Sequence, residues 1–189
     1  MSKSPNAFEA GGRKVIPAVL VYLIQGDRVL MIHRNSDPTG KVDFHSGKWN
    51  GLGGKLEVDE SALLAAQREI FEESGLHLPE ERFYSQGVIH FPNFKPQKSE
   101  DWMVFLFTAE CSSSEAQQIQ ARCAEGSLHW VGVSDVLQLN LWPGDRLFIQ
   151  DVLAQRPLTG TIWYQGGQVE RSWIQAYSVS NFRSKLESF

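Results

Sequence analysis

The chain has 189 residues, of which 42% are hydrophobic and 21% are charged, and its formal net charge is −4. This is the composition of an ordinary globular protein, and the length suits one domain with a sizeable core. The acidic balance, with a pI of about 5.7, lacks the basic footprint of a protein that binds duplex DNA or long RNA. A direct nucleic-acid partner is therefore not expected.

The sequence shows neither a secretory signal nor a membrane span. The N-terminal stretch 1–14 has no apolar core, and the longest apolar stretch, Val15–Ile24, is too short to cross a bilayer. Two cysteines, Cys111 and Cys123, do not make a disulfide framework and indicate free thiols in a reducing compartment. We therefore expect a cytoplasmic protein with no membrane partner.

The first half of the chain predicts a β-hairpin, a long loop and a helix. A frayed start is expected over residues 1–12. Two β-rich runs, 18–24 and 28–34, flank a Gly-Asp turn and predict the hairpin. The loop at 35–50 is of a length that is often functional. The apolar period then predicts a helix over 60–74, with Asp59 as its N-cap and Gly75 after its end.

The second half predicts more strands than helices. Strands are expected over 82–91, 102–111 and 127–133, with a polar loop at 92–101. Residues 112–126 are polar and fit either a helix or a loop. A short helix capped by Ser134, a helix over Pro143–Gln155 and a terminal hairpin at 160–177 follow. This order predicts one α/β domain over 13–178, with helices flanking a mostly antiparallel or mixed sheet. The tail, 179–189, has no predicted role.

Three glutamates stand out in the predicted helix. Glu69, Glu72 and Glu73 occupy positions i, i+3 and i+4, so their side chains share one face and repel one another. Only Arg68 is adjacent to relieve that repulsion. The cluster is either a solvated acidic face or a set of oxygen ligands for a hard divalent cation such as Mg²⁺.

The surroundings of the cluster favour the metal interpretation. Apolar residues on a neighbouring stripe predict that the helix is docked; they are Leu63, Leu64, Ile70 and Phe71. Just before the helix, "GLGGKLE" supplies glycines that let the backbone approach a phosphate or donate a carbonyl to a metal.

From Gly54 onward the sequence reads G-x5-E-x7-R-E-U-x-E-E-x-G-U, where U is apolar. The fixed positions are Gly54, Glu60, Arg68, Glu69, Ile70, Glu72, Glu73, Gly75 and Leu76. This pattern resembles the signature of the Nudix hydrolases. The resemblance implies an α/β/α sandwich that cleaves a nucleoside diphosphate linked to another moiety, using Mg²⁺ or Mn²⁺.

The resemblance also assigns roles. It places the metal on Glu69, Glu72 and Glu73, with the carbonyl of Gly53, and gives Arg68 and Glu60 orienting or structural roles. A metal shields phosphate charge and lowers the pKa of bound water, so that a carboxylate can act as general base. Glu72 is the first candidate for that base. Glu100 is the second, because family members often supply a further acid from the corresponding loop; a solvated loop charge is the alternative.

Three further stretches resemble the MutT-like oxidised-purine nucleoside triphosphatases; they are 47–55, 91–110 and 139–150. In that branch the residue matching Asn50 hydrogen-bonds the purine, which suits an amide with both a donor and an acceptor. The tryptophan matching Trp142 stacks on the purine in eukaryotic members. Lys55 is expected to neutralise phosphate or to be a solvated lysine.

Only one of the two acids that read the base in that branch is present. Asp145 matches the second, while Gly144 stands where the first would be. This departure argues against the broad range of oxidised adenine substrates that eukaryotic members of the branch accept. A guanine-type edge, with its N–H donors, still suits a single Asp acceptor. Phe44 and Phe148 are candidate pocket walls. The alternatives are core aromatics, a turn residue at Asn50 and a first-turn helix acid at Asp145.

The sequence thus predicts a Mg²⁺-dependent Nudix hydrolase, with Mn²⁺ as a possible substitute. Its expected reaction converts 8-oxo-dGTP to the monophosphate and pyrophosphate, which keeps damaged nucleotides out of DNA. Two other functions stay open: hydrolysis of nucleoside diphosphate sugars or other nucleoside diphosphate derivatives, and an inactive nucleotide-sensing module. The only predicted partner is a small nucleotide, and the sequence predicts no oligomeric state.

Overall fold

The computed structural model describes residues 8, 11–34 and 46–177. One large mixed sheet organises them, in the order β6-β7-β2-β1-β5-β4-β8-β9, with β3 paired to β2. Its strands are β1 Lys14–Gln25, β2 Arg28–Arg34, β3 Trp49–Asn50, β4 Phe83–Lys95, β5 Glu100–Glu110, β6 Arg122–Cys123, β7 Gly126–Gly132, β8 Leu158–Gln165 and β9 Gln168–Ala176. The helices are α1 Ala62–Ser74, α2 Ser113–Ala116 and α3 Ile149–Leu153, and four short 3-10 turns lie at Glu80–Arg82, Pro96–Lys98, Val133–Gln138 and Asp145–Leu147.

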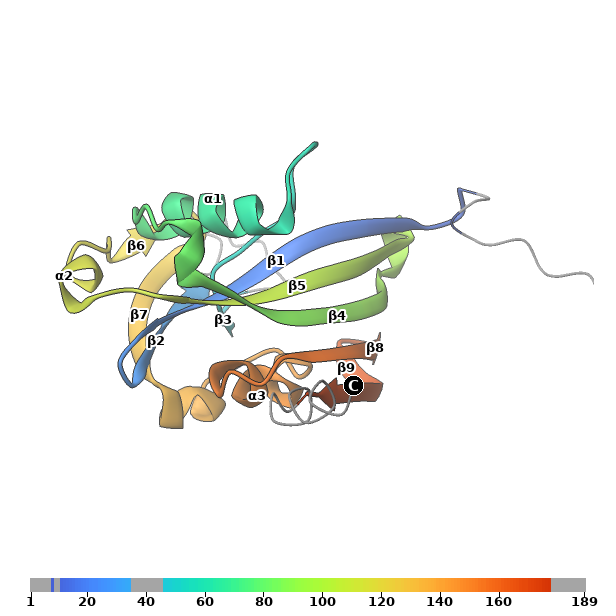
Figure 1. Ribbon diagram of the computed structural model, residues 1–189. Coiled ribbons are helices and arrows are strands. Elements are labelled where there is room, and N and C mark those ends of the chain that lie inside the picture. Colours follow the sequence, from blue (N-terminus) through green and yellow to red (C-terminus); the bar gives the residue numbers. More distant parts are fainter. Residues whose placement is uncertain (1–7, 9–10, 35–45, 178–189) are drawn as a thin grey trace, which may run out of the picture.

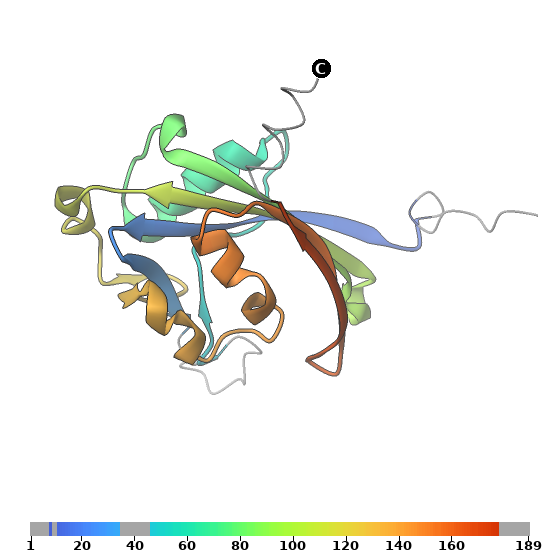
Figure 2. The same ribbon diagram turned by 60° about the horizontal axis from the view of Figure 1, so that its bottom comes forward.

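The layers confirm the predicted α/β class. Helix α1 covers one face of the central strands, and α3 lies on the other side together with the β8–β9 hairpin (Figure 1). The sheet is mixed because β1 runs parallel to β5 and β4 runs parallel to β8, while the other pairs of named strands are antiparallel. Turning the molecule shows the hairpin curving past α3 (Figure 2).

Strand β1 explains why the sheet has a core on each face. Side chains alternate across a strand, so Val19, Val21 and Leu23 pack toward α1, whereas Leu20 and Tyr22 pack toward α3. A strand buried on both faces reads as a continuous apolar run, and this is how the sequence signalled it. The two predicted hairpins, around Gly26–Asp27 and Gly166–Gly167, are confirmed.

The predicted loops are partly strand. β4 and β5 extend into the polar segment 92–101 and leave only the short turn Pro96–Lys98 between them. The undecided segment 112–126 contains α2 and β6. Polar composition misled the prediction because β4 continues beyond its pairing with β8, which ends at His90, and there pairs only with β5, with a bulge between Phe91 and Lys95.

Helix α1 corrects two expectations. Its N-cap is Ser61, whose side chain accepts a hydrogen bond from Leu64 N, rather than Asp59, which adopts a positive φ of 63° in the preceding turn. Leu64 is 55% exposed and Phe71 is 43% exposed. Ile70 is fully buried, as predicted. The other buried residues of α1 are small or acidic; they are Ala65, Ala66, Glu69, Glu73 and Ser74.

Two further helix predictions are wrong in detail. The segment after β7 is a 3-10 turn, Val133–Gln138, and Ser134 makes no cap hydrogen bond to it. The segment 143–155 does not form one helix. It breaks at Phe148 (φ −129°, ψ −21°) into the turn Asp145–Leu147 and the short α3. Phe148 is fully buried against the sheet, so packing of this side chain takes precedence over helix continuity.

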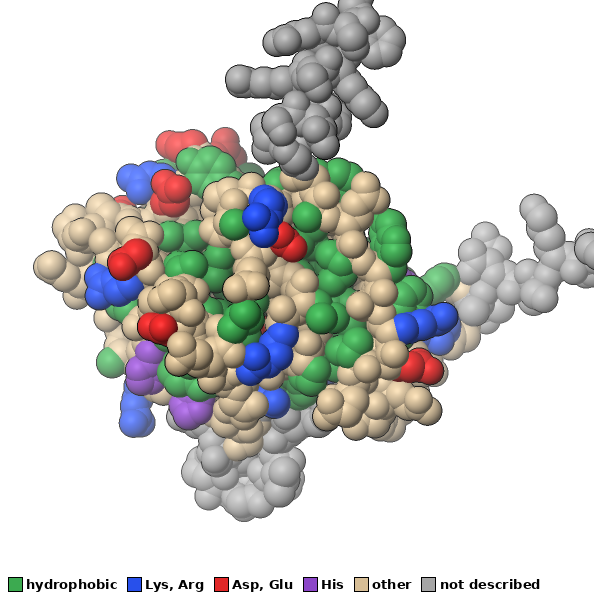
Figure 3. Space-filling view, turned by 90° about the horizontal axis from the view of Figure 1, so that it is seen from below, with side chains coloured by type: hydrophobic (Ala, Val, Ile, Leu, Met, Phe, Trp, Pro, Cys, Tyr) green, Lys and Arg blue, Asp and Glu red, His purple; other side chains and the backbone are tan. Residues whose placement is uncertain are grey.

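The surface shows no membrane-crossing helix and no basic strip on the face that carries the hairpin. No helix among the described residues is long and apolar enough to cross a bilayer. Seen from below, Lys and Arg side chains are scattered among polar and apolar ones (Figure 3).

Candidate active site

The glycine segment before α1 lies directly against β1. Val19 N donates to Gly54 O at 2.8 Å and Val21 N donates to Leu52 O at 2.7 Å, so the segment adds to the sheet as a short extra strand. A Cβ on Gly53 would meet Val19 O at 2.2 Å, and the φ of Gly53 is 143°. Only glycine satisfies both conditions. The approach fixes the Gly53–Gly54 backbone beside the glutamate face of α1.

Arg68 organises the carboxylates of the signature. Its guanidinium donates two hydrogen bonds of 2.9 Å to the carboxylate of Glu60 and one of 3.0 Å to the carbonyl of Lys55. Nη1 also donates to Glu69 at 2.8 Å and to Glu72 at 3.3 Å. This bidentate pairing lowers the pKa of Glu60 and keeps it ionised. The predicted orienting roles of Arg68 and Glu60 agree with this geometry.

The three glutamates sit in different environments. Glu69 and Glu73 are buried, while the side chain of Glu72 is 54% exposed. Burial is the main reason that the pKa values of Glu69 and Glu73 are raised; Glu125 adds to the shift of both. Glu73 Oε2 accepts a 2.8 Å hydrogen bond from Gly53 N, but its buried Oε1 has no hydrogen-bond partner within the described residues.

This donor set fits a divalent cation. A buried carboxylate oxygen with no donor, flanked by two further acids, is an oxygen ligand of the kind that Mg²⁺ prefers. Within the described residues, however, no three His, Cys, Asp or Glu side chains are arranged to hold a metal ion. The reason is visible in the contacts, since Arg68 engages Glu69 and Glu72 while Glu73 bonds to Gly53 N.

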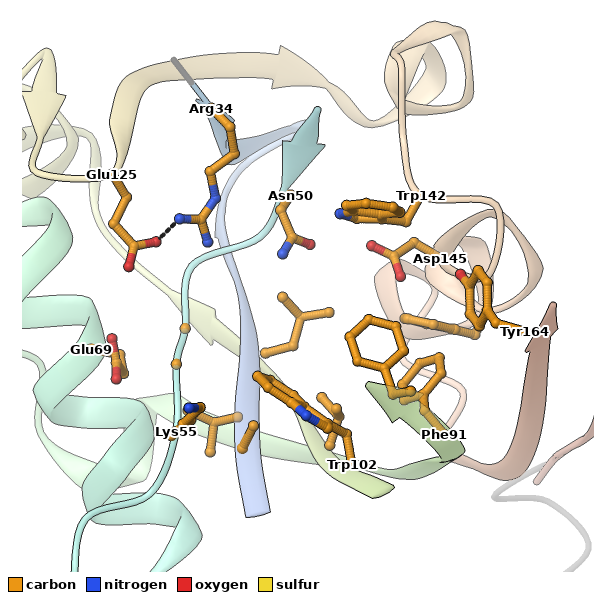
Figure 4. Close-up of a pocket in the computed structure, with 18 of the residues that line it drawn as sticks. Arg34, Asn50, Lys55, Glu69, Phe91, Trp102, Glu125, Trp142, Asp145 and Tyr164 are labelled. Atoms are coloured by element: carbon orange, nitrogen blue, oxygen red, sulfur yellow. Dashed lines mark ion pairs between the residues drawn. The ribbon is translucent and has the colours of Figure 1, made fainter. Parts of the chain in front are cut away.

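The structure adds a fourth acid that sequence reasoning missed. Glu125, in the turn between β6 and β7, lines the same pocket as Glu69 and Glu72 and forms an ion pair with Arg34 from the end of β2 (Figure 4). Glu100, the predicted second base, is not among the residues that line the pocket. Its carboxylate accepts a 3.5 Å hydrogen bond from Trp102 Nε1. The sequence held no local signal for Glu125, since it lies 52 to 56 positions after the three glutamates Glu69, Glu72 and Glu73.

A pocket of about 500 Å³ joins this acidic end to an aromatic end. Figure 4 shows Glu69, Glu125 and Arg34 on one side and Trp142, Asp145 and Tyr164 on the other. The aromatic wall is built from different elements, with ring centroids 5.5–6.2 Å apart in four pairs; its members are Phe91, Phe94, Trp102 and Tyr164. Such a volume suits a drug-sized or nucleotide-sized ligand.

Polar groups converge on the aromatic end. Asn50 lines the pocket, and its buried Oδ1 has no hydrogen-bond partner in the part of the chain that the structure describes. Asp145 is buried, and burial raises its pKa to about 7, with the Lys48 ammonium acting in the opposite direction. Lys48 Nζ also lies 5.2 Å from the ring centroid of Trp142. A carboxyl and an amide beside aromatic faces are suited to reading the edge of a planar base.

Most of the residues predicted for the site therefore come together. Those that line the pocket are Asn50, Gly53, Lys55, Glu69, Glu72, Trp142, Asp145 and Phe148. Glu73 and Arg68 contact them from behind. Lys55 Nζ lies 5.6 Å from the ring centroid of Trp102. Phe44 lies outside the described residues. The pocket residues that sequence reasoning did not name include Arg34, Phe91, Phe94, Trp102, Glu125 and Tyr164.

Fold and site together define a hydrolase of the Nudix type, and comparison with known proteins agrees. A family model described as "NUDIX domain" matches residues 14–152. The chain therefore belongs to the Nudix hydrolase family, and it is a hydrolase acting on phosphoric anhydrides. Enzymes of this family act on small nucleotide substrates and generally use divalent metal ions such as Mg²⁺.

Relatives narrow the resemblance. The chain is 30% identical over 150 residues to the oxidized purine nucleoside triphosphate hydrolase of Danio rerio, covering 79% of this chain and 87% of that protein. It is 26% identical over 163 residues to the protein of the same name from Mus musculus, covering 85% and 91%. Among solved structures, a MutT protein from Bacillus halodurans matches with a TM-score of 0.68 and 23% identity, covering 85% of this chain and 97% of that one. This likeness shows the fold.

Proposed function

We propose that this protein hydrolyses oxidised purine nucleoside triphosphates, 8-oxo-dGTP foremost, to the monophosphate and pyrophosphate. The observation that carries the proposal is that one pocket of about 500 Å³ has the glutamate cluster at its acidic end and polar groups among aromatic rings at its aromatic end. The triphosphate would lie along the glycine segment toward the glutamates, and the purine would enter the aromatic end. The similarity to two oxidized purine nucleoside triphosphate hydrolases supports this choice of substrate.

At the acidic end, Glu69, Glu72 and Glu73, with the Gly53 carbonyl, would hold Mg²⁺, and Mn²⁺ could replace it. When bound, the cation shields phosphate charge and lowers the pKa of water so that hydroxide forms near neutral pH. The unpartnered Glu73 Oε1 supports this assignment, because a cation would supply the charge that this buried oxygen lacks.

The protein's own groups then position the reaction. Arg68 restrains Glu69 and Glu72 through its hydrogen bonds, so that neither carboxylate turns away from the phosphates. Glu72 is the exposed member of the cluster and remains the proposed general base. Glu125 replaces Glu100 as the second candidate, because it shares the pocket with Glu72. Arg34, which pairs with Glu125, is placed to meet phosphate charge.

At the aromatic end, Trp142 would stack on the purine while Asn50 and Asp145 bind its edge. Both polar groups are buried, and a buried acceptor without a donor costs free energy. A base N–H that donates to it would recover that free energy. Phe148 lines the same end from the side of α3. These contacts would select a purine, whereas a nucleoside diphosphate sugar would leave the triphosphate end only partly used.

One assay tests the proposal. The kcat/KM values for 8-oxo-dGTP, dGTP, ADP-ribose and a nucleotide sugar are measured with Mg²⁺, and the products are identified. A strong preference for 8-oxo-dGTP, with monophosphate and pyrophosphate released, is the expected result. A preference for the sugar nucleotide would leave the metal site standing and overturn the base assignment. No hydrolysis of any nucleotide would favour the sensing module.

The base assignment has its own test. Glu72→Gln should lower kcat on the order of 100-fold or more while leaving the melting temperature unchanged, since this side chain is half exposed. Glu81→Gln, an exposed glutamate in the turn Glu80–Arg82, is the matched control. If Glu72→Gln keeps the wild-type rate and Glu125→Gln does not, Glu125 is the base.

A further inference from the structure

At the aromatic end of the pocket, the Tyr164 hydroxyl occupies the volume that a side chain at position 144 would need. Gly144 N donates a 2.7 Å hydrogen bond to Tyr164 Oη. A Cβ built on Gly144 would meet that same oxygen at 2.4 Å, closer than real Cβ contacts come. The two positions are 20 residues apart and exclude each other, so a tyrosine and a side chain at 144 cannot share this volume.

Tyr164 is held as part of the pocket wall. Its ring lies 5.8 Å from that of Phe94 and 6.2 Å from that of Phe91, and it lines the pocket together with Trp142 and Asp145. Strand β8, which carries it, is paired in parallel with β4, which carries Phe91 and Phe94. That pairing covers Leu158–Thr161, and Tyr164 itself pairs with Val169 of β9 just after a register shift. The position of the hydroxyl is therefore set by its strand and by the neighbouring rings. Figure 4 shows Tyr164 and Asp145 side by side.

The hydrogen bond from Gly144 determines what the hydroxyl can offer. A tyrosine oxygen that accepts from a backbone N–H still has its own O–H to donate. Burial, together with the nearby charge of Asp145, raises the pKa of Tyr164 above its ordinary value, so the group stays protonated at neutral pH. Within the described residues, the bond accepted from Gly144 is the one hydrogen bond that this hydroxyl makes. Its proton is thus available to a ligand.

A donor and an acceptor therefore stand next to each other in the pocket. Above about pH 7 Asp145 is ionised, and its carboxylate only accepts hydrogen bonds. The Tyr164 hydroxyl donates one. A 6-oxopurine presents the complementary pair, an acceptor at O6 beside a donor at N1–H. A 6-aminopurine presents the reverse, a donor at the 6-amino group beside an acceptor at N1.

We propose that Tyr164 is a specificity residue that, with Asp145, selects 6-oxopurine over 6-aminopurine nucleoside triphosphates. The hydroxyl donates to O6 and the carboxylate accepts from N1–H. This inference rests on the proposed function and narrows its substrate class to guanine-like bases. It also gives Gly144 a reason, since any side chain there would displace the hydroxyl.

The test compares two substrates that differ only at this edge, 8-oxo-dITP and 8-oxo-dATP. Wild type should favour 8-oxo-dITP in kcat/KM by about tenfold or more. Tyr164→Phe should lower kcat/KM for 8-oxo-dITP about tenfold, mainly through KM, and that for 8-oxo-dATP less than about twofold. Tyr177→Phe is the matched control: it removes a hydroxyl that hydrogen-bonds Thr159 at 3.0 Å outside the pocket, and it should leave both values unchanged.

Gly144→Ala provides a second route if Tyr164→Phe folds poorly. The added methyl group crowds Tyr164 Oη without deleting it, and the same loss of selectivity is expected. Equal losses on both substrates in either variant would mean that Tyr164 only supports the wall, and would overturn the inference. A wild type that hydrolyses both oxidised purines without discrimination also overturns it and leaves the proposed function intact. Turnover of sugar nucleotides alone overturns the proposed function itself.

Discussion

Replacing Asp145 with asparagine tests whether ionisation of this buried acid lowers the stability of the protein. Asp145 is only 8% exposed, and burial raises its pKa to about 7 from an ordinary value of 3.8, even though Lys48 pulls in the opposite direction. The fold therefore favours the neutral carboxyl and tolerates the carboxylate poorly. Asparagine has nearly the same size and never ionises, so Asp145→Asn removes the charge and little else.

The sign and size of the effect follow from the shift. The unfolded chain releases the Asp145 proton above about pH 4 and the folded chain only near pH 7, so in that window the folded state binds more protons. The free energy of unfolding of wild type must therefore fall as pH rises from about 4 to about 7, and the loss is complete above that. About 3 pKa units correspond to roughly 4 kcal/mol in total. Between pH 5 and pH 8 the part due to Asp145 is about 2–3 kcal/mol.

Urea unfolding of wild type and Asp145→Asn at pH 5 and pH 8 measures this quantity. The stability of the variant relative to wild type should increase by about 2–3 kcal/mol between the two pH values. Taking the difference cancels other titrating groups and the packing of the amide. If the relative stability is the same at both pH values, Asp145 is ionised in the fold, and the account of a desolvated acid in this pocket is wrong.

Three other substitutions test the acidic end and the pocket wall. Gly54→Ala would place a Cβ 2.4 Å from Glu69 Oε1. Because that carboxylate can rotate away, we expect kcat/KM to fall about 10–100-fold and the free energy of unfolding to change by less than about 1 kcal/mol. A large drop in melting temperature would contradict this. Glu60→Gln removes the bidentate partner of Arg68 and should lower kcat about tenfold in steady-state assays, with KM little changed. Asp101→Asn weakens the ion pair between the buried Asp101 and Arg13, and also the 2.7 Å hydrogen bond that Asn93 N donates at the bulge in β4. The free energy of unfolding, measured in urea, should fall by about 2 kcal/mol. An unchanged midpoint would show that other contacts hold the bulge.

The sequence was most informative where the chemistry is local. The three glutamates and Arg68 lie within six positions of one helix, so spacing alone placed their side chains together. The αL glycine that ends α1, Gly75 with φ 81°, was likewise readable because its role depends only on its neighbours. The continuous apolar run of β1 identified the buried strand for the same reason.

The sequence was least informative where distant segments meet. Glu125 reaches the pocket from the turn before β7 and Tyr164 from β8, and neither has a local pattern that marks it. The docking face of α1 was misjudged because apolar periodicity favoured Leu64 and Phe71, whereas the helix turns Glu69 and Glu73 toward the sheet. Burying two acids is unfavourable for folding, and a pattern method that rewards apolar burial cannot anticipate it.

The two ends of the pocket therefore share one physical feature, a carboxylate that the fold buries without fully pairing it. At the acidic end Glu73 keeps an oxygen without a hydrogen-bond partner among the described residues. The glutamates there, Glu69, Glu72, Glu73 and Glu125, outnumber the arginines Arg34 and Arg68, and a divalent cation can neutralise the excess negative charge. At the other end burial raises the pKa of Asp145 to about 7, against the lowering effect of the Lys48 ammonium. A single hydrogen-bond donor such as a base N–H is enough there. The same ligand would have to satisfy both ends at once, which a nucleotide does by joining a metal-binding polyphosphate to a hydrogen-bonding base. Burying these acids lowers the stability of the fold, and a ligand that satisfies both ends recovers that free energy. A ligand that satisfies only one end recovers less, so the pocket would bind its substrate selectively.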